Sequence, residues 1–196
     1  MNEVKTVKVV MVGESGAGKS ALLSRFLENN FEDVMPSTIG IDFKHKVVEL
    51  HDGSKVRLQL WDTAGQERFR QLAPSYVRDA GVIILTFDKS SEEAIEQLIR
   101  WKRLIERDRR PNSLIVIVGN KCDLSTSSRR ASTATLKKLI KEAGDLYMET
   151  SAKTGKNVQE LFKKVARLPF PEAKKSNDTI RLGEPARKVN RKFMCC

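Results

Sequence analysis

Residues 8–20 read KVVMVGESGAGKS, an apolar run that passes directly into a glycine-rich stretch. The run indicates a buried strand, and the following residues predict a helix over 19–28 with one apolar face, formed by Leu22, Leu23, Phe26 and Leu27. Between strand and helix the sequence fits the pattern G-x-x-x-x-G-K-[ST] through Gly13, Gly18, Lys19 and Ser20. Because the pattern stands between the strand and the helix that it requires, we predict a phosphate-binding loop rather than an ordinary glycine-rich turn.

Each residue type in this loop has a physical task. Glycine permits backbone angles and a close approach that a side chain would block. Successive backbone N–H groups and the positive end of the following helix attract phosphate oxygens, so we expect phosphate contacts from Gly13, Ser15, Gly16, Ala17, Gly18, Lys19 and Ser20. Within that set the Lys19 ammonium would neutralise the β- and γ-phosphates, and the Ser20 hydroxyl would bind Mg²⁺.

Strand-like and helix-like segments alternate through the rest of the chain. Strands are predicted at 5–12, 42–51, 55–61, 82–87, 114–119 and 145–150, and helices at 19–28, 92–107, 132–143 and 157–168, with a loop and short helix within 63–78. Asp52-Gly53 is typical of a hairpin turn between the second and third strands. This order predicts an α/β three-layer sandwich whose six-stranded sheet has five parallel strands and one antiparallel strand, at residues 42–51.

Length and composition indicate one folded domain with a tail. The chain has 196 residues, 40% of them hydrophobic, and we expect the domain at 1–170. Residues 171–196 carry seven Lys/Arg against three Asp/Glu and lose hydrophobic periodicity, which predicts a disordered basic tail. Because the N-terminus has no signal-peptide pattern and no stretch is apolar enough to span a membrane, we expect a cytosolic protein. The three cysteines, two of them adjacent at the end, predict neither a disulfide framework nor a metal site.

A base-recognition motif, Asn120-Lys121-Cys122-Asp123, follows the fifth predicted strand. A carboxylate such as that of Asp123 can accept two hydrogen bonds from the N1–H and 2-amino groups of guanine, and adenine presents no such pair of donors. After the sixth strand, Ser151-Ala152-Lys153 can offer a backbone N–H to the guanine carbonyl and an apolar lysine stem to the base. Both motifs stand at strand ends on the sheet edge that carries the phosphate loop. The predicted ligand is a guanine nucleotide, bound through Asn120, Lys121, Asp123, Ser151, Ala152 and Lys153.

The segment Trp61-Asp62-Thr63-Ala64-Gly65-Gln66-Glu67 supplies groups for phosphoryl chemistry. Asp62, at the end of an apolar strand, can hold Mg²⁺ through water, the Gly65 N–H can contact a γ-phosphate, and Gln66 can orient an attacking water. Thr38, in the loop before the second strand, can offer its hydroxyl to Mg²⁺ and its backbone to the γ-phosphate. We therefore predict Gln66 as the catalytic residue and the Mg²⁺ ligands as Ser20, Thr38 and Asp62.

These motifs, in this order, resemble those of the Rab GTPases of the Ras-like superfamily. The resemblance covers residues 5–168 and the last two cysteines, and it rests on the segments 13–20, 38–43, 61–69, 120–123 and 149–153. It implies a P-loop GTPase domain that binds GTP and GDP with Mg²⁺ and hydrolyses GTP. It also implies that Phe31 packs against the guanine and that effectors read a patch made of Ile41, Phe43, Trp61 and Tyr76. Core packing is the alternative interpretation of the three aromatic residues in this patch.

Two shorter stretches narrow the resemblance further. Residues 56–61 and 74–79 are similar to the Golgi-associated Rab six subfamily, whereas Phe87-Asp88-Lys89-Ser90 departs from the family pattern. The resemblance implies a role in vesicle traffic on the cytosolic face of intracellular membranes, at the Golgi, with cycling through the cytosol. The implied partners are a nucleotide exchange factor, a GTPase-activating protein, effectors and a prenyl-carrying GDP-dissociation inhibitor, and the protein is expected to be a monomer.

The chain ends in Phe193-Met194-Cys195-Cys196, which is not a C-a-a-X box because no cysteine stands fourth from the end. In Rab-like proteins such a pair carries two geranylgeranyl chains. Two lipid chains give stable anchoring where one gives only marginal binding, and basic residues of the tail would add attraction to an anionic leaflet. The resemblance therefore implies lipidation of Cys195 and Cys196 and a peripheral attachment to membranes.

Three alternatives remain open. One is a GTP-locked binding module with negligible hydrolysis, against which the presence of Thr38, Gly65 and Gln66 argues. A second is a Rab protein of the endosomal pathway. The third, a nucleic-acid-binding protein, is suggested only by the net charge of +11 and the pI of about 9.7. Because no RNA-binding motif accompanies that charge, we expect no nucleic-acid partner.

Overall fold

The computed structural model describes residues 4–36, 38, 40–63, 73–124 and 133–171. Its six strands are β1 (Lys5–Val12), β2 (Ile41–Glu49), β3 (Lys55–Thr63), β4 (Val82–Asp88), β5 (Leu114–Asn120) and β6 (Leu146–Glu149). Its five helices are α1 (Lys19–Glu28), α2 (Ala73–Val77), α3 (Ala94–Asp108), α4 (Thr133–Ala143) and α5 (Val158–Arg167). Within these ranges, no helix has the length and apolar character needed to cross a membrane.

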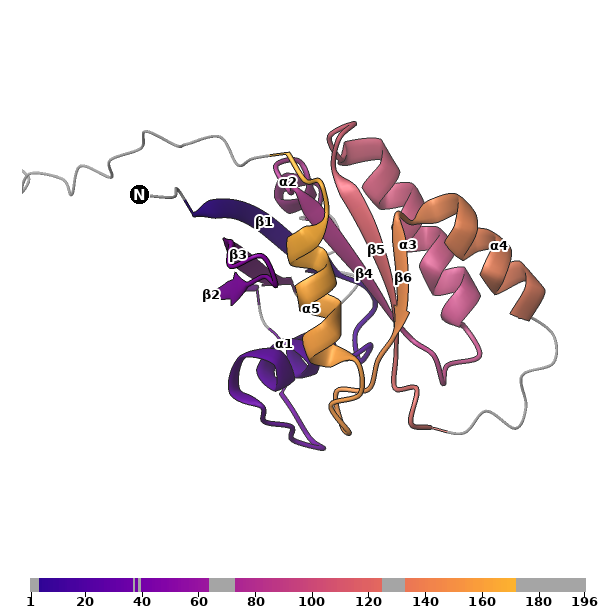
Figure 1. Ribbon diagram of the computed structural model, residues 1–196. Coiled ribbons are helices and arrows are strands. Elements are labelled where there is room, and N and C mark those ends of the chain that lie inside the picture. The colour runs from indigo at the N-terminus through magenta and orange to yellow at the C-terminus, as the bar shows by residue number, and fades with distance from the viewer. Residues whose placement is uncertain (1–3, 37, 39, 64–72, 125–132, 172–196) are drawn as a thin grey trace, which may run out of the picture.

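The six strands form one sheet in the order β2-β3-β1-β4-β5-β6 (Figure 1). The pairs of β1 with β3 and β4, of β4 with β5 and of β5 with β6 are parallel, and only the β2–β3 pair is antiparallel. The predicted α/β sandwich with one antiparallel strand is therefore confirmed. Since parallel strands end at the same edge, the loops that follow β1, β4, β5 and β6 lie on one side of the domain.

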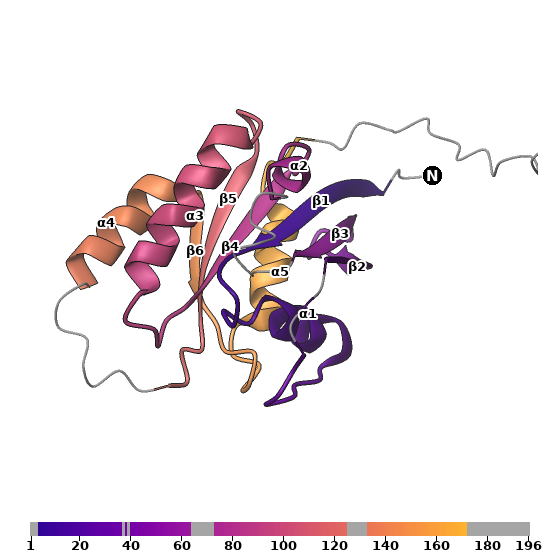
Figure 2. The ribbon, with the colours of Figure 1, turned by 180° about the vertical axis from the view of Figure 1, so that it is seen from behind.

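Successive side chains of the central strands pack alternately into two separate hydrophobic cores, one on each face of the sheet. Val9 and Met11 of β1 belong to the core under α1 and α5, and Val10 and Val12 belong to the core under α2, α3 and α4. Figures 1 and 2 show α1 beside α5 on one side of the sheet and α3 beside α4 on the other. The period of two along each strand thus produces the three layers, because both faces of a buried strand need a cover of helices. Trp101 of α3, 1% exposed, lies in the second core, as predicted.

The hairpin between β2 and β3 differs in length from the prediction. Its last paired residues are Glu49 and Lys55, so the connection is the five-residue segment 50–54 and β2 ends two residues early. The carboxylate of Asp52 accepts hydrogen bonds from the Ser54 N–H at 3.0 Å and the Ser54 hydroxyl at 2.6 Å. Gly53 adopts φ = +76° and donates its N–H to the Leu50 carbonyl at 3.0 Å. These local bonds replace the ladder that would have extended the strand to residue 51.

Stacked aromatic rings join the two helices of the first core. The Phe26 ring of α1 and the Phe162 ring of α5 lie 4.0 Å apart between centroids at 17°, and neither side chain is more than 2% exposed. We expect Phe162→Ala to lower the free energy of unfolding by about 3–5 kcal/mol, because the lost ring leaves a cavity between helices and sheet. Phe43→Ala, which removes the same ring from a side chain 48% exposed, should lower it by about 1 kcal/mol or less. Equal losses in urea unfolding of the two variants would contradict this account of the core.

Candidate functional site

The loop between β1 and α1 contains two positions that only glycine can occupy. Gly13 has φ = +140°, and a Cβ there would lie 2.0 Å from the Thr86 carbonyl oxygen of β4. Gly18 has φ = +89°, and its Cβ would lie 2.3 Å from the side-chain nitrogen of Asn120. The motif glycines therefore let the loop pack directly on the ends of β4 and β5, and the first turn of α1 begins at Lys19.

Lys19 carries a buried positive charge in this loop. Its side chain is 5% exposed, and its ammonium donates hydrogen bonds to the carbonyl oxygens of Gly13 at 3.0 Å and Glu14 at 2.9 Å. Burial lowers the pKa of Lys19 to about 8, although the nearby charges of Asp62 and Glu14 act in the opposite direction. A polyphosphate against the loop would favour the charged form strongly, because it would neutralise an ammonium that has lost most of its water.

Three oxygen-bearing side chains converge beside Lys19. The Ser20 hydroxyl donates to the Asp62 carboxylate at 2.5 Å and lies 2.7 Å from the Thr38 hydroxyl, which itself donates to the same carboxylate oxygen at 3.3 Å. The other Asp62 oxygen is buried and has no hydrogen-bond partner among the described residues. Burial raises the pKa of the Asp62 carboxyl, although the Ser20 hydrogen bond and the Lys19 charge oppose the rise. The cluster thus contains a desolvated carboxylate with one unsatisfied oxygen.

This donor set fits Mg²⁺. Carboxylate and hydroxyl oxygens are the ligands that the hard cation prefers, usually with phosphates and water completing its shell. Ser20, Thr38 and Asp62 would hold it, and the ion would supply positive charge to phosphate oxygens at this point. Asp62 is kept in place by the neighbouring Thr63, whose buried hydroxyl donates to the Met11 carbonyl of β1 at 2.6 Å. Thr63 belongs to the motif at residues 61–67. Its hydrogen bond to Met11 depends on the register of β3 against β1, which the motif alone does not predict.

Asn120 joins the phosphate loop to the base-recognition segments. Its side chain is 1% exposed, and its amide nitrogen donates to the Ala17 carbonyl at 3.0 Å. Its amide oxygen accepts from the Ala152 N–H at 3.2 Å and from the Thr150 hydroxyl at 3.3 Å. Asn120 therefore bridges loops of this chain that are 103 and 32 residues away in sequence. The prediction placed Asn120 in the guanine site, and the geometry gives its amide a second task as a cross-link.

The other residues predicted for the base surround the same region. Phe31 and Lys121 line one cavity of about 370 Å³ together with Ser15, Lys19 and Ser20. Lys121 has φ = +59°, a left-handed conformation, and donates its ammonium to the Asp88 carboxylate at 2.7 Å. One cavity thus connects the predicted phosphate and base subsites.

Ser151, Ala152 and Lys153, which were also predicted for the base, are not among the residues that line this cavity. Ser151 and Ala152 are buried, whereas the Lys153 ammonium is exposed and donates to the Asp33 carboxylate at 2.9 Å. That hydrogen bond and the Asp33 charge raise the pKa of Lys153, and the charge of Asp123 adds to the rise. Arg25 of α1 was not predicted. Its guanidinium donates to the carbonyls of Ala152 and Lys153, both at 2.8 Å, and so fastens this loop to the first helix.

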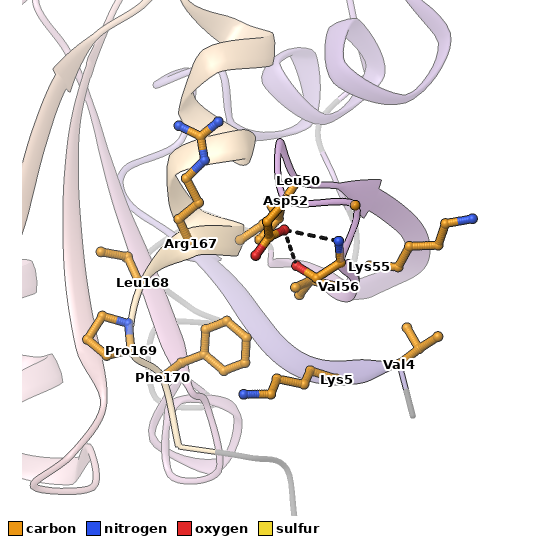
Figure 3. Close-up of a pocket in the computed structure, with 13 residues that line it drawn as sticks. Val4, Lys5, Leu50, Asp52, Lys55, Val56, Arg167, Leu168, Pro169 and Phe170 are labelled. Atoms are coloured by element: carbon orange, nitrogen blue, oxygen red, sulfur yellow. Dashed lines mark hydrogen bonds between the residues drawn. The ribbon is translucent and has the colours of Figure 1, made fainter. Parts of the chain in front are cut away.

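A larger cavity lies at the other end of β1. It measures about 680 Å³ and is enclosed by the start of β1, the 50–54 connection and the end of α5 (Figure 3). Its charged side chains are Lys5, Asp52, Lys55 and Arg167, and the Asp52 carboxylate is hydrogen-bonded within its own turn. This cavity has neither the glycine-rich loop nor the helix start that lines the smaller one. Size alone therefore does not identify the nucleotide site, and the polar groups favour the smaller cavity.

The residues predicted for the effector patch lie on β2, β3 and α2. Phe43 is 48% exposed, and its ring meets that of Trp61 edge-on, with centroids 5.3 Å apart at 66°. Trp61 and Tyr76 are half-buried and pack against the second core, so the core-packing interpretation holds in part for both. Ile41, also half-buried, stands at the start of β2 opposite Thr63. Four predicted residues, Gly65, Gln66, Cys195 and Cys196, lie outside the described residues.

Comparison with known proteins agrees with the motifs and the fold. The model of the Ras family matches residues 8–169. The Ras-related protein Rab-5A of Dictyostelium discoideum is 43% identical over 166 residues, which are 85% of this chain and 82% of that protein. The Ras-related protein RAB1BV of Beta vulgaris is 44% identical over 161 residues, 82% of this chain and 74% of that protein. The Ras-related protein RABD2c of Arabidopsis thaliana is 42% identical over 197 aligned positions, 96% of this chain and 95% of its own length. The chain therefore belongs to the Ras family of small GTPases, among its Rab-related members.

Proposed function

We propose that the protein is a Rab-type switch that binds GTP and GDP with Mg²⁺, hydrolyses GTP and recruits effectors in vesicle traffic. The observation that carries this proposal is the cluster of Ser20, Thr38 and Asp62 beside the buried Lys19 ammonium, with one Asp62 oxygen unsatisfied among the described residues. A buried carboxylate and a buried ammonium left without full partners are unfavourable unless a cation and an anion arrive to complete them. A nucleoside triphosphate bound with Mg²⁺ has the charges that this site lacks.

The same contacts support a mechanism for switching. Thr38 comes from the segment between α1 and β2, and Asp62 lies near the end of β3. We expect two segments, 31–44 and 63–78, to change with the nucleotide; Thr38 belongs to the first, and Asp62 directly precedes the second. Backbone N–H groups of Thr38 and Gly65 would contact a γ-phosphate, and loss of that phosphate on hydrolysis would release both segments. Because the aromatic patch lies on the adjoining strands β2 and β3, its surroundings would change with the nucleotide, and effectors would read that change.

Guanine specificity rests on the carboxylate of Asp123. In Asp123→Asn, the amide offers a donor where xanthine presents a carbonyl, so we expect xanthosine nucleotides to be preferred. Loss of two charge-assisted hydrogen bonds should weaken GTP binding on the order of 10²- to 10⁴-fold in a filter-binding assay. Asp33→Asn is the matched control, because it removes a carboxylate that contacts Lys153 of the segment 151–153 and not one predicted to bind the base, so it should leave guanine preference intact. Unaltered GTP preference in Asp123→Asn would remove this residue from the base site.

Hydrolysis should be slow without a partner protein. Residues 29–37 contain no arginine, so this segment supplies no cation to the transition state, and we expect an unaided rate on the order of 10⁻³–10⁻⁴ s⁻¹. Gln66→Leu should slow single turnover further, because the attacking water loses its orienting amide, and Gln97→Leu on α3 should not. An unaided rate near 1 s⁻¹ would contradict this assignment. A chain that retained GTP even with an activating protein would instead be the GTP-locked module.

Attachment to membranes is proposed to depend on the end of the chain. We infer a domain over 1–170 and a basic tail over 171–196 that carries two geranylgeranyl chains on Cys195 and Cys196, shielded in the cytosol by a prenyl-carrying GDP-dissociation inhibitor. Changing both cysteines to serine should leave GTP binding intact and move the protein from the membrane to the soluble fraction. Cys122→Ser, which removes a thiol near the base site, is the control and should leave membrane association unchanged. Membrane binding that survived the double change would refute the lipid anchor.

The compartment is proposed from the resemblance of residues 56–61 and 74–79 to the Golgi-associated Rab six subfamily. The named relatives, Rab-5A, RAB1BV and RABD2c, have closely similar identities to this chain and do not select one subfamily. Imaging of the full-length tagged chain beside Golgi and endosome markers, with the double serine variant as the diffuse reference, distinguishes the Golgi from the endosomal alternative.

A further inference from the structure

The segment 87–90, Phe-Asp-Lys-Ser, departs from the Rab pattern and lies at the centre of the base-recognition region. It begins with the last two residues of β4, which pair with the end of β5, and the Lys89 N–H donates to the Asn120 carbonyl at 2.9 Å. The backbone of the atypical segment is therefore bonded to the first residue of the motif 120–123. Neither the nucleotide site nor the aromatic patch as described above gives the side chain of Lys89 a task.

The Lys89 side chain reaches the other base-recognition loop. Its ammonium donates to one oxygen of the Glu149 carboxylate at 2.5 Å, and the Tyr147 hydroxyl donates to the other oxygen at 3.1 Å. Glu149 ends β6 and immediately precedes the loop 150–153. Its carbonyl also accepts a hydrogen bond from the Asn157 side chain at 2.8 Å, so Glu149 is held at both its side chain and its backbone.

The residue before Lys89 performs a parallel task for the first loop. One oxygen of the Asp88 carboxylate accepts from the Lys121 ammonium at 2.7 Å. The other oxygen accepts from the Ser90 N–H at 2.6 Å and the Ser90 hydroxyl at 2.5 Å. Asp88, the last residue of β4, thus binds Lys121 of the first loop, and Lys89, the next residue, binds Glu149 directly before the second loop. These two adjacent residues carry opposite charges.

The two loops are also bonded to each other, so that movement of one affects the other. The Thr150 N–H donates to the Gly119 carbonyl at 2.9 Å, and the Cys122 N–H donates to the Thr150 carbonyl at 3.0 Å. Space between them is limited, because a Cβ on Gly119 would lie 3.0 Å from the Tyr147 hydroxyl. Displacement of Glu149 would therefore shift Thr150 and, through it, the backbone at Cys122, one residue before Asp123.

The electrostatics of the Lys89–Glu149 pair support its persistence at neutral pH. Partial burial raises the pKa of the Glu149 carboxyl, but the hydrogen bonds from Lys89 and Tyr147 and the Lys89 charge outweigh that effect and hold the pKa below its usual value. The Lys89 and Glu149 side chains are 26% and 41% exposed, so the contact is less screened than an ion pair in open solvent.

We propose that Lys89 is a positioning residue that lengthens the residence of guanine nucleotides by holding Glu149, and with it the loop 150–153, against the loop 120–123. The inference rests on the proposed guanine site. It assigns to the atypical segment a specific effect on the rate at which the base is released, separate from contacts to the phosphates. We call the Lys89–Glu149 ion pair, which joins the end of β4 to the end of β6, the clamp.

Charge reversal tests the clamp in the full-length chain. Lys89→Glu and Glu149→Lys each place like charges opposite one another, and each should accelerate release of a fluorescent GDP analogue on the order of tenfold. The double variant Lys89→Glu/Glu149→Lys restores an opposite pair and should return the rate to within about threefold of the parent. Lys89→Arg keeps a charged donor and should also release GDP at about the parental rate.

A second readout separates positioning from a general loss of stability. Inosine diphosphate lacks the 2-amino group of guanine, so it depends less on the placement of Asp123. Lys89→Glu should therefore accelerate GDP release more than inosine diphosphate release and reduce the ratio between them. Lys102 and Glu106 on α3 form the matched control, an ion pair at 2.8 Å with side chains 22% and 40% exposed. Lys102→Glu should leave release of both nucleotides unchanged.

The outcomes distinguish this proposal from the proposed function. If the parent binds GDP tightly but Lys89→Glu releases it at the parental rate, or if the double variant stays fast, the clamp is wrong and the guanine site stands. If the single variants accelerate both nucleotides equally while their melting temperatures fall, the effect is general destabilisation and the clamp is also overturned. If the parent itself fails to bind guanine nucleotides, both proposals fail.

Discussion

Parallel pairing of β1 with both β3 and β4 is the constraint on which the candidate site depends. The register places Met11 opposite Asp62 on one side and Val12 opposite Leu85 on the other, so three strand ends meet around the glycine-rich loop. The loop can then pack on β4 closely enough that Gly13 has no room for a Cβ, while Thr63 bonds to β1 and holds Asp62 in place. A shift of one residue in the β1–β3 register would turn Asp62 to the other face of the sheet and remove it from Ser20.

The charges that gather at this edge make the site dependent on its ligand. Lys19 donates to two loop carbonyls, which use two of the three donors of its ammonium, and Asp62 is bonded through only one of its oxygens to the described residues. Such groups are retained at a cost in stability, since burial disfavours the charged form of each, as the shifted pKa values of both side chains indicate. The arrangement is poorly suited to a structural core and well suited to a nucleotide that brings opposite charges. A nucleotide that bound here would therefore stabilise the folded domain.

The base region contains two kinds of residue: buried residues that cross-link the loops, and exposed residues that are predicted to contact the base. Asn120 is fully buried and bonded at both ends of its amide, whereas Asp123 and Lys153 are exposed. The buried residue holds the loops, and the exposed ones remain available to a base. The aromatic patch shows the same division, because Trp61 and Tyr76 pack on the core while Phe43 presents its ring to solvent. A residue predicted as functional from a motif can thus carry a structural task at the same time.

The sequence by itself determined the fold class, the phosphate loop and the order of the nucleotide motifs, because these depend on local periodicity and on residue types at fixed short spacings. The bonds that organise the site could not be predicted in this way. Arg25 to Ala152, Lys121 to Asp88 and Lys89 to Glu149 join residues separated by 127, 33 and 60 positions. Each of these pairs depends on which strands become neighbours and in what register. Many other charged residues of this chain could make the same kind of hydrogen bond, so residue type alone does not identify the partner. Only the tertiary structure selects among them, since hydrogen bonds need their two atoms within about 3 Å and in line.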